Sequence, residues 1–105
     1  MYSRVTLFEL DTLRVEVEAG VDRFNSLVVP ALREQQGFEG VYVLVSQDGR
    51  GLVLTLWDSE ASAEAGLGSG FYAAQLAQFV TFFRSPPGRE GYDVVVADLP
   101  MLAAD

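Results

Sequence analysis

GFEGVYVLVSQDGRGLVLTLW, residues 37–57, contains two apolar runs joined by a short polar turn. A strand with one face in water alternates apolar and polar residues, because successive side chains point to opposite faces of a sheet. Here apolar side chains occupy both faces of each run: Val41, Val43 and Val45 against Tyr42 and Leu44, then Leu52, Leu54 and Leu56 against Val53 and Trp57. The sequence therefore predicts a sheet whose two faces both need cover.

The cover available to that sheet sets the expected assembly. A chain of 105 residues has helical material for about one face, so the second face needs another layer. A second copy of the same chain is the simplest such layer. We expect a homodimer with an apolar interface that buries on the order of 2,000 Å² in total.

The chain before this hairpin predicts one strand and one helix. Residues 3–9 alternate as a strand, and residues 11–18 fit either a continuing strand or the approach to a helix. The two faces of the first strand carry Val5 and Leu7, and Arg4, Thr6 and Phe8. Residues 19–36 have apolar residues at helical spacing. Pro30 lies inside that helix, where its ring removes a hydrogen bond, so we expect a kink or a restart just before it.

The hairpin is expected to turn at residues 47–51, where Asp48-Gly49 tolerates positive φ. A second helix should follow, because Asp58-Ser59 supplies a side-chain cap and Glu60 an acidic first turn. The glycines in residues 66–70 predict a break in this helix.

The helix is expected to resume over residues 71–83, with one apolar stripe along it: Tyr72, Leu76, Phe79, Val80 and Phe83. The proline pair in residues 85–88 ends it. Residues 92–97, YDVVVA, read as a final strand, and we expect the tail from Pro100 to Asp105 to be loose or to contact the partner.

This order of elements is strand, helix, strand, strand, helix, strand. It predicts an α+β fold of the ferredoxin-like βαββαβ type, with both helices on one face of an antiparallel sheet. No linker or internal repeat divides the chain, so residues 1–105 are expected to form one domain.

The charge and the hydropathy of the chain limit its partners. A net charge of −8 and seven scattered Arg residues disfavour a nucleic-acid partner, because phosphate backbones repel an acidic surface. No apolar run approaches the roughly 18 residues of a membrane span, and the N-terminus lacks the pattern of a secretory signal. We expect a cytoplasmic protein with no membrane partner.

Three residue types with reactive or ionisable side chains are missing altogether: Cys, His and Lys. Thiolate nucleophiles, thiolate metal sites, imidazole acid-base catalysis and Schiff-base chemistry are therefore excluded. The chemistry left to the chain comes from carboxylates, hydroxyls, amides, Arg and one indole. We expect no metal and no cofactor.

Several motifs resemble one known family. Pro30, Gly37–Tyr42, the glycine turn, Leu54–Ala61 and Phe71-Tyr72 are similar to the antibiotic biosynthesis monooxygenase family of dimeric α/β barrels, over roughly residues 3–98. The resemblance implies two sheets that pack face to face as a closed barrel, with a pocket in each subunit between sheet and helices. The family contains cofactor-free monooxygenases, haem-degrading enzymes and many members without a known function.

The departures from the family narrow what the resemblance implies. Haem-degrading relatives carry a His in the second helix, where this chain offers Gln75. The quinone-forming monooxygenases place a polar amide on the strand before the family tryptophan, where this chain has Val53. Only Trp57 is carried over as a candidate site residue, and it is often a marker of the fold alone.

Six residues are candidates for a ligand pocket: Trp57, Tyr72, Tyr42, Asn25, Phe79 and Phe83. The indole N–H of Trp57 could donate to a bound oxygen, or the ring could simply close the junction of sheet and helix. Tyr72 could reach a pocket mouth or belong to the core, and Tyr42 could face either the pocket or the dimer interface. Asn25, the only Asn, fits a pocket edge or a solvated helix position.

Other polar residues can be explained by their structural positions alone. Arg84 ends the second helix, where a cation favours the helix dipole. Glu9 and Asp93 are the carboxylates expected to be partly buried, although edge strands often carry charges. No catalytic residue can be assigned from these patterns.

Three functions remain open. The first is a cofactor-independent monooxygenase for a phenolic or quinol-like aromatic molecule, since such a substrate, once deprotonated, can itself reduce O₂ in a dry pocket. The second is a non-catalytic module that binds an apolar aromatic molecule, and the third is a purely structural protein with a filled core. A cavity of roughly 300 Å³ or more, with Trp57 on its wall, would favour the first two.

Overall fold

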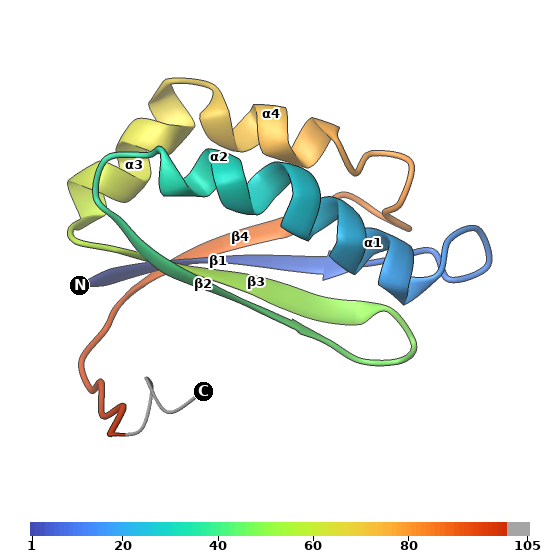
Figure 1. Cartoon of the computed structure of the whole chain (residues 1–105), viewed down its shortest axis with the longest axis horizontal. Coiled ribbons are helices and arrows are strands. Elements are labelled where there is room, and N and C mark those ends of the chain that lie inside the picture. The colour runs from blue at the N-terminus through green and yellow to red at the C-terminus, as the bar shows by residue number, and fades with distance from the viewer. Residues whose placement is uncertain (101–105) are drawn as a thin grey trace.

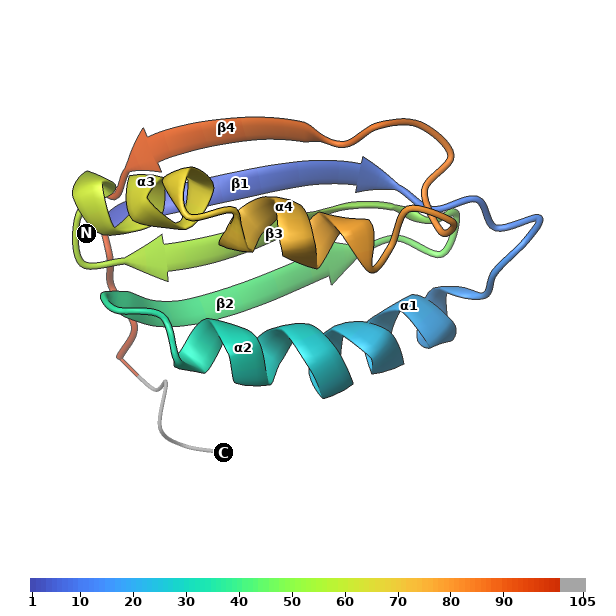
Figure 2. The same cartoon turned by 90° about the horizontal axis from the view of Figure 1, so that it is seen from above.

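The computed structural model describes residues 1–100 as a four-stranded antiparallel sheet with all helices on one face (Figures 1 and 2). The strand order is β2-β3-β1-β4. The elements are β1 (Tyr2–Glu9), α1 (Val17–Arg23), η1 (Phe24–Val28), α2 (Val29–Arg33), β2 (Phe38–Val45), β3 (Arg50–Trp57), α3 (Glu60–Gly68), α4 (Phe71–Ala77) and β4 (Gly88–Asp93). The predicted ferredoxin-like α+β fold is confirmed.

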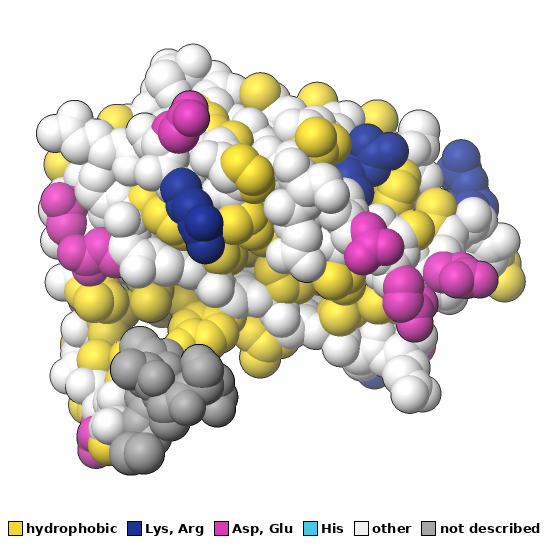
Figure 3. All heavy atoms as spheres, in the orientation of Figure 1, with side chains coloured by type: hydrophobic (Ala, Val, Ile, Leu, Met, Phe, Trp, Pro, Cys, Tyr) yellow, Lys and Arg dark blue, Asp and Glu magenta, His cyan; other side chains and the backbone are white. Residues whose placement is uncertain are grey.

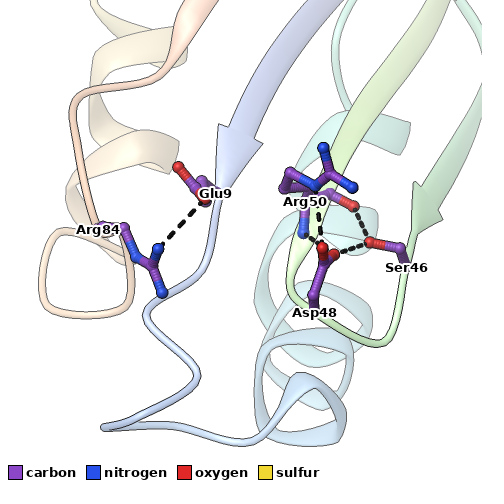
Figure 4. A network of polar contacts seen from close by, with 5 residues as sticks. All are labelled: Glu9, Ser46, Asp48, Arg50 and Arg84. Carbon is purple, nitrogen blue, oxygen red and sulfur yellow. Dashed lines mark hydrogen bonds and ion pairs between the residues drawn. The ribbon is translucent and has the colours of Figure 1, made fainter.

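The predicted hairpin forms between β2 and β3. Gly49 has φ of 92°, the left-handed conformation that glycine adopts without strain. Its neighbour Asp48 accepts hydrogen bonds from Ser46 and from the Arg50 backbone N–H, and pairs with the Arg50 side chain at 3.0 Å (Figure 4). These contacts lower the pKa of Asp48, with the Ser46 hydrogen bond as the largest cause.

The first helix begins earlier than expected and is interrupted where proline predicts it. Residues 11–16 form a loop, and the helix starts at Val17. A five-residue π-helical segment, η1, then separates α1 from α2, and Pro30 stands in the first turn of α2. Because proline has no N–H to donate, the preceding turn widens and the helix continues in the same direction.

The second helix differs from the prediction in two places. Ser59 caps α3 as expected, its hydroxyl accepting from the Ser62 backbone N–H at 3.2 Å. The helix runs on through Gly66 and Gly68, however, so the predicted break is confirmed only at the end of residues 66–70, at Gly70, where φ is 86°.

The expected continuation of this helix to residue 83 is also wrong. Helix α4 ends at Ala77, because the backbone from Phe82 to Arg84 bonds to the end of β1 instead: Asp11 N–H donates to Phe82 O, and Arg84 N–H donates to Glu9 O, both at 2.8 Å. Val80 therefore falls in a turn and is exposed, off the predicted stripe.

The last strand lies earlier than residues 92–97. Strand β4 pairs with β1 from Leu7↔Gly88 to Tyr2↔Asp93. One more hydrogen bond joins Val94 N–H to Met1 O, one residue before β1 begins. The apolar residues beyond it leave the sheet, with Val95 87% and Val96 81% exposed. The tail predicted from Pro100 to Asp105 lies, after its first residue, outside the described part of the chain.

The strand register assigns every side chain of the sheet to one of two faces. The face toward the helices, here called the inner face, carries among others Arg4, Thr6, Thr55 and Trp57. The core forms where this face meets the helices: Tyr2, Val28, Leu32, Trp57, Ala63 and Phe79. Figure 3 shows hydrophobic side chains reaching the surface along the boundary between helices and sheet, among dispersed charges.

The opposite, outer face is also apolar. It carries Val5, Leu7, Tyr42, Leu44, Leu52, Leu54 and Leu56, with Tyr92 and Glu90 at the β4 edge. No helix of the described residues covers it (Figure 1). Leu44 is 53% exposed and Tyr42 47%, so the two-sided sheet expected from residues 37–57 is present.

Candidate functional site

A cavity of about 120 Å³ lies between the inner face and the helices and is partly open to solvent. It is smaller than the roughly 300 Å³ set as the criterion for a ligand pocket, so its volume does not favour the two ligand-binding functions over a structural protein with a filled core. Its walls come from every layer of the fold, with Val43, Val45, Val53 and Trp57 from the hairpin, Phe24 and Val28 from η1, and Phe71, Leu76, Phe79 and Phe83 from the second helical segment and its turn.

Aromatic side chains contribute seven of the residues that line the cavity. The Phe79 ring stacks against Phe83 with a centroid distance of 6.1 Å and lies 6.4 Å from Phe24. On the opposite side, Phe38 packs edge-on against Trp57 at 5.7 Å. Aromatic pairs at such distances contribute packing energy beyond their buried area. They also give the cavity rigid walls that suit a flat ring.

The indole of Trp57 is already hydrogen-bonded within the protein. Its Nε1–H donates to Thr55 Oγ1 at 2.9 Å, and the Thr55 hydroxyl donates in turn to the Arg4 carbonyl at 3.2 Å. Both side chains are buried. The indole N–H that was expected to bind a ligand oxygen is therefore already hydrogen-bonded to Thr55, two residues earlier on the same strand.

A second polar pair joins the sheet to α4. The hydroxyls of Thr6 and Tyr72 lie 2.6 Å apart, and either can be the donor. The Arg89 guanidinium lies 5.6 Å from the centre of the Tyr72 ring. Both hydroxyl-bearing residues line the cavity, so a ligand oxygen beside them would meet a group that can donate or accept a hydrogen bond.

Arg4 is the charged side chain of the cavity wall, and sequence reasoning did not select it. Its side chain is 10% exposed, and Nη2 donates to Glu64 Oε2 at 3.0 Å. Its Nε–H is fully buried and has no hydrogen-bond partner among the described residues. The alternation of residues 3–9 could have identified Arg4, because it puts Arg4 on the same strand face as Thr6 and Phe8. The seven Arg residues are scattered through the sequence, however, so nothing distinguished Arg4 from the others.

The structure brings four of the six predicted pocket residues together. Trp57, Tyr72, Phe79 and Phe83 all line the cavity, as do the family-position residues Val53 and Gln75. Tyr42 does not, because its register with Leu54 puts it on the outer face. Asn25 does not either, because it is exposed on η1. Of the readings left open for these two, the pocket reading is wrong.

The carboxylates form no catalytic cluster. Glu9 pairs with Arg84 at 3.5 Å (Figure 4), so Arg84 joins the end of β1 to the turn after α4. Asp93 is exposed, so its expected partial burial is wrong. Within residues 1–100 no group of three or more His, Cys, Asp or Glu side chains could hold a metal ion.

No helix in the described part of the chain has the length and apolar character needed to cross a membrane.

Comparison with solved structures confirms the fold. A protein of unknown function from Nitrosomonas europaea, NE2512, is 23% identical with a TM-score of 0.73, covering 94% of this chain and 93% of that one. The monooxygenase from the gene ActVA-Orf6 of Streptomyces coelicolor, in complex with nanaomycin D, is 23% identical with a TM-score of 0.70 and covers 94% and 91%. SnoaB from Streptomyces nogalater, a cofactor-independent oxygenase, is 12% identical with a TM-score of 0.71 and covers 94% and 96%.

No protein-family model matches the sequence, and no curated protein matches it.

Proposed function

We propose that this protein is a cofactor-independent monooxygenase that acts on a phenolic or quinol-like aromatic molecule. One observation carries the proposal: an apolar cavity with aromatic residues in its wall, whose polar groups are hydroxyls, a guanidinium and an amide from Arg4, Thr6, Thr55, Tyr72 and Gln75. Such a cavity holds a flat ring in a dry place and places donors beside its oxygen. Two of the similar structures, the ActVA-Orf6 monooxygenase and SnoaB, support the reaction class.

Once the substrate hydroxyl is deprotonated, a step for which the cavity wall supplies no carboxylate, the chemistry needs no group that this chain lacks. A deprotonated hydroquinone gives one electron to O₂, forming a semiquinone and superoxide, and recombination at ring carbon makes a C–O bond. The resulting hydroperoxide loses water and leaves a new carbonyl, so that one oxygen atom enters the product and the other leaves as water. The protein stabilises the substrate anion and excludes bulk water from the radical pair.

The size of the cavity favours a one-ring substrate. An apolar cavity of about 150 Å³ holds one benzene ring, and the space here is about 120 Å³, so even a one-ring hydroquinone would extend partly into the open side. A three-ring anthrone would have to extend through the open side or displace wall residues such as Phe71. We therefore expect hydroquinones with one ring to react faster than anthrones.

A second candidate, a non-catalytic binding protein, is favoured by one specific observation. The cavity wall includes no carboxylate among the described residues, Val53 is apolar, and the Trp57 N–H is bound to Thr55. A general base for the substrate hydroxyl is therefore missing from the wall. A binding protein would keep the aromatic walls and form its complex without turnover.

The deciding experiment measures oxidation under O₂ of a one-ring hydroquinone and of anthrone, with ¹⁸O₂ to trace one oxygen atom into the product. The monooxygenase predicts labelled product and a rate that falls in Trp57→Phe, whose ring no longer bonds to Thr55. The matched control is Tyr42→Phe on the outer face, which should keep the rate. Binding that raises the melting temperature without any labelled product would instead support the binding protein.

We also propose that two copies of this chain pack through their outer faces. The apolar side chains there are contiguous over β1, β3 and β2, and several are about half exposed. Contiguous apolar surface of this kind is unusual on a monomer and marks an interaction site. A second copy satisfies it with the same surface on both sides, as a two-fold dimer requires.

A further inference from the structure

One end of the cavity contains a buried cation whose neighbours do not fully satisfy it. Arg4 stands directly opposite Thr55 in the β1–β3 ladder and two residues from Thr6 on the same face. A guanidinium has five N–H donors and cannot be deprotonated in a protein. With its side chain 10% exposed and Nε–H unpartnered among the described residues, Arg4 retains hydrogen-bonding capacity inside a dry site.

The present partner of Arg4 is only loosely held. Glu64 Oε2 accepts from Nη2 at 3.0 Å, yet the Glu64 side chain is 51% exposed and can be solvated instead. Water that reaches the Glu64 end of the pair screens its attraction to Arg4. A ligand anion that reaches Arg4 from the cavity would therefore compete with a weak partner.

The other charged and titratable groups around Arg4 come from three elements. The Tyr2 ring of β1 lies 5.8 Å from the guanidinium carbon, and Tyr72 of α4 bonds to Thr6. From β4, Arg89 faces Tyr72, and Asp93 stands beside Tyr2 in the register and is exposed. The cavity wall of β2, β3, η1 and α2 adds no charge.

We propose that Arg4 anchors the anionic oxygen of the bound molecule, so that this site selects a small planar ring in its phenolate form. The ring lies against the aromatic walls, and its oxygen points to the end of the cavity where Arg4, Thr6 and Tyr72 meet. Arg4 is thus a specificity-determining residue, with Glu64 as the internal competitor that the ligand displaces. The proposal rests on the phenolic ligand class of the proposed function, but it requires no turnover.

The test uses 4-nitrophenol, a one-ring probe whose phenolate is yellow and whose neutral form is not. An opposite charge within a few ångströms lowers an acid's pKa by about 1–3 units. We expect the pKa of bound 4-nitrophenol to fall by at least about one unit relative to the free probe, which is a tenfold preference for the phenolate. Absorbance titrations at saturating protein measure this shift directly.

Two variants should move the result in opposite directions. Arg4→Met removes the cation and should abolish the shift, whereas Glu64→Gln removes the competing carboxylate and should enlarge it and tighten phenolate binding. The matched control is Arg50→Met, which removes a cation at the exposed hairpin turn, away from the cavity. It should leave both the shift and the affinity unchanged.

Several outcomes would overturn the anchor. These are absence of 4-nitrophenol binding, an unshifted or raised pKa of the bound probe in the native protein, or an equal shift in a folded Arg4→Met variant. If Arg4→Met does not fold, Glu64→Gln decides alone, and a smaller or equal shift there counts against the anchor. Labelled product without a pKa shift of the bound probe would contradict the role of Arg4 and support the monooxygenase. A pKa shift without labelled product would support the role of Arg4 and contradict the monooxygenase.

Discussion

The inner and outer faces of this sheet come from the same four strands and differ in what they carry. On the inner face Arg4, Thr6 and Thr55 add polar atoms to an apolar wall, and the hydroxyls of Thr6 and Thr55 are hydrogen-bonded. The outer face carries aliphatic side chains such as Leu44, Leu52 and Leu54 on β2 and β3, with Ser3 on β1 and polar groups at the β4 edge, where Tyr92 donates to Glu90 at 2.9 Å.

The difference indicates two kinds of partner. A surface that meets another protein chain needs shape and apolar area, which leucines supply. A surface that meets a small ring needs a few placed polar groups as well, since these orient the ligand. We therefore read the inner face as the ligand face and the outer face as the protein face.

The largest expected effect comes from placing a charge on the outer face. Leu44→Glu should leave the subunit folded, because Leu44 is 53% exposed within one chain, and should prevent pairing. A buried charge without a partner costs on the order of 3–5 kcal/mol, so we expect the dimer dissociation constant to rise at least a hundredfold. Light scattering at micromolar concentration measures the change from dimer to monomer.

A leucine of similar exposure away from the outer face provides the control for that substitution. Leu27 in η1 is 45% exposed and does not line the cavity. Leu27→Glu should therefore leave the mass in solution unchanged. A native protein that is monomeric at this concentration, or a Leu44→Glu dimer of unchanged affinity, would contradict the assignment of the outer face.

A smaller effect is expected from the hydrogen bonds of the inner face. Thr55→Val keeps the shape of the side chain and removes the oxygen that accepts from the Trp57 indole at 2.9 Å. A buried N–H left without a partner costs about 1–3 kcal/mol, so the free energy of unfolding should fall by that amount. Urea unfolding followed by Trp57 fluorescence measures it.

Tyr42→Phe removes a hydroxyl from the outer face and is the matched comparison for Thr55→Val. The Tyr42 hydroxyl makes no hydrogen bond to any described residue, and the side chain is 47% exposed. Its loss should change the unfolding free energy by less than about 0.5 kcal/mol. Equal losses in the two variants would mean that the faces do not differ in the way proposed here.

The sequence predicted the order of the elements because local signals agreed with the final fold. The apolar runs of residues 37–57, the Ser59 cap and the Pro30 interruption all appear where the pattern placed them. What failed was decided by strand pairing over long distances. The three valines at residues 94–96 favour a strand, yet the register pairs Tyr2 of β1 with Asp93, so the β1–β4 pairing ends before them.

The candidate site was predictable in its walls and not in its charge. Aromatic spacing identified Phe79 and Phe83, because a helical stripe must face the sheet. Arg4 was not identifiable, since its role depends on Glu64 and Thr55, which are distant in sequence and reach it only through the fold. Tyr42 was open between two faces, because the alternation of a strand does not say which face the helices cover.

The smallest expected effect comes from Asp58, just before the start of α3. It tests whether the loss of stability in acid arises outside both faces of the sheet. Asp58 accepts hydrogen bonds from the hydroxyls of Ser62, at 2.6 Å, and Ser59, at 3.1 Å, and the Ser62 bond is the largest cause of its lowered pKa. A carboxyl whose pKa is lower in the folded state stabilises the protein above its unfolded pKa, near 3.8, and loses that contribution as the pH falls through the folded value. Asp58→Asn should therefore flatten the fall in melting temperature below about pH 4.

Measurements at different protein and salt concentrations distinguish whether the fall in melting temperature at low pH comes from Asp58 or from the dimer interface on the outer face. Asp58 lies in the link between β3 and α3, outside both faces, so its effect should be the same at low and high protein concentration, whereas acid dissociation of the dimer would depend on concentration. The hydroxyl partners of Asp58 are neutral and the charge of the N-terminus is the smallest cause of its lowered pKa, so salt should leave most of the effect of Asp58 in place. At Asp48 the charge of Arg50 also lowers the pKa, and there salt should weaken the effect of Asp48→Asn, because exposed charges are screened. Asp58→Asn could leave the fall in melting temperature at low pH unchanged, while that fall depends on protein concentration. This result would assign the acid sensitivity to dissociation of the dimer instead.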